Sequence, residues 1–184
     1  MAWTDSSIMG RTALAKGQAG AKHFLSEEAQ GDFHYVYGPY ATPVMTIAPG
    51  DVVAVETLDA FGGAIKTEDD LPSQVLNMPF VNPDRGTLPY EPVVGTMGGS
   101  PEIEAVSSLQ PDYWGGNMDC PDVAPGAIMY FPVQREGGYF YIGDCHGRQG
   151  DGELCGVAVE IPATVTVQID LIKGWAIPGV RLET

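Results

Sequence analysis

One segment carries the clearest pattern in the chain: ATVTVQIDLIK, residues 163–173. From residue 164 to residue 171, polar and apolar side chains alternate one by one. Successive side chains of a β-strand point to opposite faces, so this pattern predicts a strand over Thr164–Ile172 with one buried face. An amphipathic helix would need apolar residues three and four positions apart, which this segment lacks.

Strand signals recur along the chain from Phe33 onward, where β-branched and aromatic residues form short runs between turns. A Pro-Gly pair stands in the turns 48–51 and 124–127, where proline suits the first corner and glycine the second. The further segments predicted as strands are Val44–Ile47, Val52–Leu58, Ile128–Pro132, Tyr139–Ile142 and Val157–Ile161. This pattern predicts a mainly β fold, an antiparallel β-sandwich or a barrel-like domain.

We expect one or two short helices beside these strands. Residues 100–109 begin with a serine suited to the N-cap, a proline at the first helical position and acidic side chains in the first turn. Residues 11–30 are rich in alanine but contain two glycines. We therefore treat residues 1–32 as an N-terminal arm, helical or loose, and residues 33–184 as a single β domain.

The composition excludes several classes of protein. Hydrophobic residues make up 44% of the 184 positions and charged residues only 18%, which is unlike a disordered chain. The net charge of −15 repels phosphate backbones and anionic lipids, so we expect neither nucleic acid nor a membrane as a partner. Three cysteines do not make a disulfide framework, and no signal peptide is evident, so we expect a cytoplasmic protein.

Three loops collect side chains that bind metals or transfer protons. They are residues 115–120, residues 143–153, and residues 34–37 together with 59–63. A histidine with nearby carboxylates suits a divalent cation, and glycines let the backbone approach a ligand closely. A Gly-Asp-Gly sequence is also an ordinary turn, in which the acid caps backbone amides. The residues alone leave both interpretations open.

The same loops lie in motifs that resemble the acetamidase/formamidase family. In the first half these motifs are His34–Tyr37, Pro49–Asp51, Glu56–Gly63 and Asn82-Pro83. In the second half they are Gly115–Asp119, Pro125–Ala127, Gly143–His146, Gln149–Gly156 and Asp170–Gly174. The resemblance covers approximately residues 33–184, and Gln149–Gly156 is its specific part. Members usually carry a further strand-rich stretch after Asn82–Arg85, so the chain is identified as a shortened member.

The resemblance implies a β-sandwich amidase that hydrolyses short-chain aliphatic amides, of the formamide and acetamide type, to carboxylate and ammonia. It also implies a homodimer or a higher homo-oligomer. Amide hydrolysis needs an activated water, a stabiliser for the oxyanion and an acid for the leaving nitrogen. A divalent metal, zinc in our interpretation, would activate the water and polarise the carbonyl. The partner we expect is therefore a small neutral amide.

Residue types within the family motifs suggest roles for individual side chains. We expect the metal to be held by His34, Asp119 and His146. Glu153 is expected to act as the general base on the metal-activated water and then to protonate the departing ammonia. Further candidates, as ligands or as acceptors that orient a histidine ring, are Asp59 and Asp144.

Two other interpretations stay open at this point. In the first, Cys145 is a nucleophile with Glu153 and Lys173 as partners, as in amidases of the nitrilase type, although the flanking sequences do not resemble that family. In the second, the chain is a shortened non-catalytic relative that binds a small molecule or a metal, or serves as an assembly module. The missing central stretch favours this second alternative.

Overall fold

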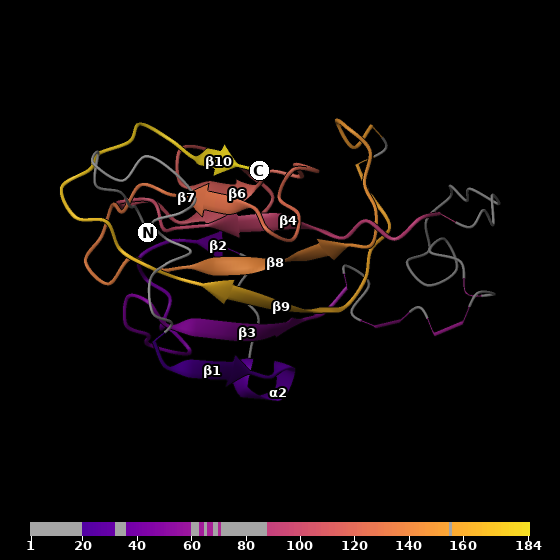
Figure 1. The fold of residues 1–184 in the computed structure, drawn as a ribbon, viewed down its shortest axis with the longest axis horizontal. Helices are drawn as coiled ribbons and strands as arrows, with labels where there is room; N and C mark the ends of the chain where they lie inside the picture. The colour runs from indigo at the N-terminus through magenta and orange to yellow at the C-terminus, as the bar shows by residue number, and fades with distance from the viewer. Residues whose placement is uncertain are drawn as a thin grey trace.

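The structure is a computed structural model that describes residues 20–31, 36–59, 63–64, 66–67, 70, 88–154 and 156–184. Within these residues the regular structure is almost entirely β, as the alternating segments predict (Figure 1). The helix in this part of the chain is α2 (Glu27–Gln30), and the side chain of Ser26 caps it by accepting from Ala29 N. No described helix is long and apolar enough to cross a membrane.

The first of the two larger sheets contains β1 (Lys22–Leu25), β3 (Val52–Thr57) and β9 (Ala163–Gln168) in that order. The strand β3 pairs with β1 in parallel and with β9 in antiparallel orientation. Its valines at 53 and 55 are buried with Leu25, because the alternation places them on one face. This sheet confirms the strand predictions for residues 52–58 and 164–172 over most of their length.

The second larger sheet is antiparallel, with β4 (Val93–Gly98) between β6 (Gly115–Asn117) and β8 (Tyr141–His146). It packs against the first sheet through shared apolar contacts, since Ile142 and Val167 belong to the same two core clusters. The carboxyl ends of β8 and β6 lead into two of the loops singled out in the sequence.

Two small antiparallel sheets complete the described part of the chain. In one, β2 (Val36–Tyr37) pairs with β5 (Val106–Ser107), and in the other β7 (Ile128–Tyr130) pairs with β10 (Arg181–Glu183). The β7 strand confirms the prediction for Ile128–Pro132. The pairing of β2 with β5 fixes the position of Tyr37 beside the second larger sheet.

The structure corrects three predictions of local structure. Residues 100–109 are not helical, because Ser100 turns its hydroxyl to Pro101 O (2.7 Å) and the following residues pair as β5. Residues 44–47 form no strand. The segment 157–161 forms only a single bridge, at Glu160. Within the predicted arm, residues 22–25 are a strand of the first sheet, and residues 1–19 lie outside the described residues.

Candidate active site

A glycine in the middle of β4 forms the floor of the candidate site. A Cβ built on Gly95 would lie 2.6 Å from Asp119 Oδ1, 2.7 Å from Asp144 Oδ2 and 2.8 Å from His146 Cε1. The carbonyl of Gly95 also accepts hydrogen bonds from Met118 N (3.0 Å) and Asp119 N (3.1 Å). The missing side chain therefore lets three polar side chains from β8 and the loop after β6 meet over the backbone of β4.

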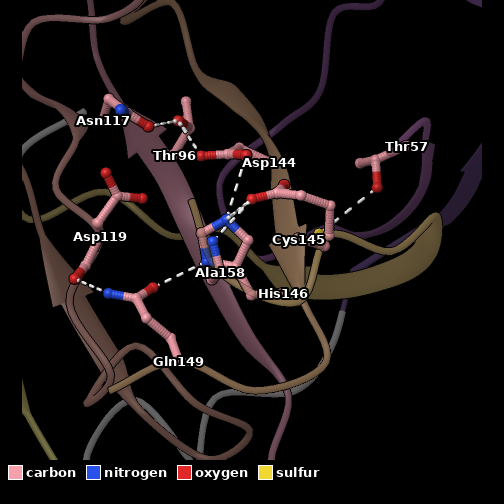
Figure 2. A network of polar contacts seen from close by, with 10 residues as sticks. Thr57, Thr96, Asn117, Asp119, Asp144, Cys145, His146, Gln149 and Ala158 are labelled. Atoms are coloured by element: carbon pink, nitrogen blue, oxygen red, sulfur yellow. Dashed lines mark hydrogen bonds and ion pairs between the residues drawn. The ribbon is translucent and has the colours of Figure 1, made fainter. Parts of the chain in front are cut away.

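His146 is the centre of this group, and its side chain is fully buried. Its Nδ1 lies 2.8 Å from Gln149 Oε1, and Gln149 Nε2 donates to the backbone carbonyl of Asp119. The amide is thus oriented with its oxygen toward the imidazole, so that Nδ1 carries a proton and donates it. The other ring nitrogen, Nε2, faces carboxylates (Figure 2).

Two carboxylates face Nε2 of His146, Asp144 Oδ1 at 3.3 Å and Glu160 Oε1 at 3.4 Å. Burial lowers the pKa of the imidazole, but hydrogen bonds to these two carboxylates and to Gln149 outweigh it and raise the pKa to about 11. For Asp144, burial raises the pKa, and the contacts with His146 and the hydrogen bonds to Glu160 and Thr96 lower it further than burial raises it. The site is therefore built to hold positive charge at Nε2.

Asp119 lies on the other side of the cluster. Burial raises the pKa of its carboxyl group to about 7, with further contributions from the nearby Glu153 and Asp144 carboxylates and a hydrogen bond with Glu153. Its Oδ1 atom is buried and has no hydrogen-bond partner among the described residues, and the same holds for Glu160 Oε2. Buried carboxylate oxygens without partners are rare and ask for an explanation.

Three of the site carboxylates stand on strained backbone. Among the described non-glycine residues, positive φ occurs at Asp119 (44°), Tyr139 (38°), Asp144 (56°) and Glu153 (40°). Side chains with a Cβ rarely adopt this region, and such residues concentrate at functional sites. The ladder between β4 and β8 is interrupted at Gly95 and Asp144. These two residues stand opposite each other but do not form a β-pair, whereas the residues on either side of them do. The backbone therefore departs from regular β geometry at the place where the carboxylates converge.

The group opens into a cavity of about 700 Å³. Its polar wall includes Tyr37, Thr96, Asn117, Asp119, Asp144, Glu153 and Glu160. Residues 41–47 and apolar side chains of the first larger sheet also line this cavity. Thr96 Oγ1 donates to Asn117 Oδ1 (2.6 Å) and lies 3.4 Å from Asp144 Oδ2 (Figure 2). A small molecule entering this cavity would meet these carboxylates, two of which, Asp144 and Glu160, contact the buried imidazole of His146.

Four of the residues predicted from the sequence are brought together here: Asp119, Asp144, His146 and Glu153. Asp59 is not a member of either ligand group found among the described residues, and its Oδ2 accepts from Gly63 N (3.1 Å). The predicted ligand His34 lies outside the described residues.

Sequence reasoning assigned no role to Glu160 and Gln149. Glu160 is the one charged residue in the apolar run Val157–Ile161, which is a signal that could have identified it. Gln149 belongs to the specific Gln149–Gly156 motif, but its bond to the imidazole depends on the folding of the loop. The segment from residue 157 to residue 161 runs along the end of β8, where Ile161 N donates to Cys145 O (3.0 Å).

The residues present fit a divalent cation. Ligand atoms of Asp119, Asp144 and His146 lie within 4.8 Å of one another, and those of His146, Glu153 and Glu160 form a second overlapping group. One imidazole nitrogen with several carboxylate oxygens is a donor set suited to zinc or a harder cation. A cation would also satisfy the buried Oδ1 of Asp119, which has no protein partner in the described part of the chain.

The environment of Cys145 does not favour a nucleophilic thiolate. Its side chain is buried, and burial raises the pKa of the thiol above its ordinary value. Its Sγ lies 3.4 Å from Thr57 Oγ1, and Cys145 lines a different cavity, between β4 and β9. A thiol that stays protonated and lines a different cavity is a poor nucleophile.

The fold and the site together define a class of protein. It is a mainly β protein in which carboxylates surround one oriented histidine. A sequence profile of the Acetamidase/Formamidase family matches residues 84–179. The chain belongs to this family, as its sequence motifs predict.

Relatives of known name agree with this assignment. The chain is 36% identical over 105 residues to an acetamidase of Mycolicibacterium smegmatis, and 38% identical over 72 residues to a formamidase of Methylophilus methylotrophus. These matches span only 26% and 17% of the two relatives' lengths.

Solved structures extend the comparison to most of the chain. The crystal structure of an acetamidase from Yersinia enterocolitica superposes with a TM-score of 0.80 and 39% identity, covering 91% of this chain and 73% of that one. A gamma lactamase from Delftia acidovorans shares the fold, with a TM-score of 0.72 at 17% identity.

Proposed function

We propose that this chain hydrolyses short-chain aliphatic amides to a carboxylate and ammonia in the cavity above Gly95. One observation carries the proposal: in a family member, the buried His146 lies in one group of potential ligands with Asp119 and Asp144 and in a second with Glu153 and Glu160. The amidase names of the relatives support amide bonds as the target.

Asp119, Asp144 and His146 are the residues we propose as ligands of a divalent metal, with zinc as the first choice. A bound cation of this kind lowers the pKa of water toward neutrality and polarises a carbonyl group. Gln149 holds the imidazole with Nε2 toward the cavity, so the ring enters the site in the orientation that a ligand needs. His34 remains a further proposed ligand, on the sequence motif alone.

Glu153 is the residue we propose as the carrier of protons. Its carboxylate lies close enough to Asp119 to raise the pKa of that residue and belongs to the same group as His146 and Glu160. It would accept a proton from the attacking water while the new C–O bond forms. It would then deliver that proton to the amide nitrogen as the C–N bond breaks, so that ammonia leaves.

The substitution Glu153→Gln tests this role, because it keeps the shape and hydrogen bonding of the side chain but removes the base. Turnover of acetamide, measured as ammonia release, should fall by about 10²–10⁴-fold, while zinc content measured on the purified protein should survive. Replacing His146 with alanine should abolish zinc content and turnover together. Equal turnover in the parent and both variants would overturn the assignment of the site.

One observation favours a second function, a binding module without turnover: the chain matches only a short part of its curated relatives. A shortened member could bind metal or small molecules without turnover. Ammonia release from formamide and acetamide, measured before and after treatment with a chelator, separates the two functions. An amidase loses turnover on chelation, whereas a binding module binds zinc and releases no ammonia from either amide.

We also propose that the chain forms a homodimer or a higher homo-oligomer. The family resemblance points to one, and β9 stands at the end of the first sheet, with its outer edge unpaired among the described residues. Light scattering at micromolar concentration should give at least twice the mass of one chain. A single-chain mass would contradict the proposal.

A further inference from the structure

Tyr37 has a buried hydroxyl group that neither the fold nor the proposed proton transfer uses. The residue is 2% exposed and lines the same cavity as Asp119 and Asp144. Its oxygen has no hydrogen-bond partner among the described residues. A buried hydroxyl group without a partner destabilises the folded state. A hydroxyl group at this position therefore suggests a functional role.

The neighbouring groups leave the proton of Tyr37 available. The hydroxyl of Thr96 lies beside the phenol but donates to Asn117 Oδ1 at 2.6 Å. The hydroxyl of Tyr141, whose ring packs edge-on against that of Tyr37 at 5.0 Å, donates to Gly38 O. The ring contact and the pairing of β2 with β5 fix the position of the phenol, while its O–H group remains free to donate.

Burial keeps the phenol of Tyr37 neutral. Burial raises its pKa well above the ordinary value, the nearby hydroxyl of Thr96 lowers it by less, and the carboxylates of Asp144 and Asp119 add to the rise. A neutral phenol can donate a hydrogen bond. Tyr37, Asp119 and Asp144 line the same cavity.

An amide substrate needs both kinds of partner in this cavity. Its N–H groups can donate to carboxylate oxygens, and Asp144 and Glu160 line the cavity as such acceptors. Its carbonyl oxygen needs donors, and it gains negative charge as water adds to the carbon. We propose that Tyr37 is the donor to this carbonyl oxygen, and so a catalytic residue of the amide hydrolysis proposed above, on which this inference rests.

The experiment compares Tyr37→Phe with Tyr141→Phe, since each substitution removes one hydroxyl group from a packed pair of rings. For Tyr37→Phe we expect kcat/KM on acetamide to fall by about 10²–10³-fold, the usual effect of losing one donor to an oxyanion. The zinc affinity should stay within about threefold of the parent, and the melting temperature should equal or exceed that of the parent, because no protein hydrogen bond is lost. Tyr141→Phe should lower the melting temperature, because it loses the bond to Gly38 O, and should reduce kcat/KM far less than Tyr37→Phe.

A binding measurement separates this inference from the proposed function. Acetamide affinity, measured by NMR in the Glu153→Gln background, should weaken by about 3- to 10-fold when Tyr37→Phe is added. If the parent binds acetamide with this dependence on Tyr37 but releases no ammonia, the hydrolysis proposal fails and the assignment of the donor stands. Equal acetamide affinity with and without the hydroxyl, no acetamide binding by the parent, or equal loss of stability and activity in Tyr37→Phe would each overturn the assignment.

Discussion

The two larger sheets of this molecule differ in how closely they follow the rules of regular β structure. The sheet β1-β3-β9 pairs continuously, with six consecutive residue pairs between β3 and β9 and valines facing one core. The sheet β6-β4-β8 contains a glycine in its central strand, an interrupted ladder and a positive φ at Asp144. The first sheet contributes stability, and the second gives up part of its regularity to bring carboxylates together.

The largest expected effect comes from filling the gap over β4. Gly95→Ala would place a methyl group within 2.8 Å of Asp119, Asp144 and His146, closer than real contacts allow. We expect stoichiometric zinc binding, measured by calorimetry, and amide turnover to be lost together. Gly143→Ala is the matched control in the same sheet, because a Cβ there meets nothing within 4 Å and zinc binding should persist. Unchanged zinc binding by Gly95→Ala would place the metal elsewhere.

A smaller effect is expected from the residue that orients the histidine. Gln149→Leu removes the acceptor at 2.8 Å from His146 Nδ1, so the imidazole is no longer held in one tautomer and orientation. Zinc affinity should fall by about 10–100-fold, as is usual for residues that support a metal ligand. The matched change in the regular sheet is Gln168→Leu at an exposed position of β9, for which zinc titrations should match the parent. Equal affinity in both variants would show that Gln149 does not support the metal.

The smallest effect concerns the regular sheet and the pH. Asp51, buried before β3, accepts hydrogen bonds from Ala48 N and Ala21 N and pairs with His23 at 2.8 Å. The bond from Ala48 is the main cause that lowers its pKa, followed by His23. A carboxyl group with a lowered folded pKa stabilises the fold above its unfolded pKa of about 4, and this stabilisation is lost as the pH falls further.

Asp51→Asn should therefore lower the melting temperature at pH 7, and the difference from the parent should shrink as the pH falls below about 4. Thermal unfolding followed by circular dichroism measures both effects without any activity assay. Asp122→Asn, at an exposed aspartate, is the control and should match the parent at each pH. A difference that grows in acid would contradict the assigned role of Asp51.

The contrast between the sheets also explains what the sequence could predict. The strands β3 and β9 were predictable because their side chains alternate locally and the two faces have different environments. The helix expected at residues 100–109 was wrong, because its capping signals are local, whereas the segment pairs with β2, some seventy residues away. Local propensity is a weak predictor where a distant strand competes for the backbone.

The candidate site follows the same division. Asp119, Asp144, His146 and Glu153 could be proposed from the sequence because metal-binding side chains are concentrated in glycine-rich loops there. Gly95 carries no such signal, and Tyr37 lies in the singled-out segment 34–37 but was given no role. The roles of both residues arise only when the chain folds. Gly95 leaves room for side chains from two other segments, and Tyr37, on β2, lines the same cavity as those side chains.

The floor at Gly95 also has a genetic consequence. Every amino acid other than glycine adds at least a Cβ, so any missense change of this codon places an atom among Asp119, Asp144 and His146. A library randomised at this codon would therefore yield almost only inactive clones. Residues 41–47, which also line the cavity, are largely exposed and offer the better place for substitutions meant to change the substrate of the proposed hydrolysis.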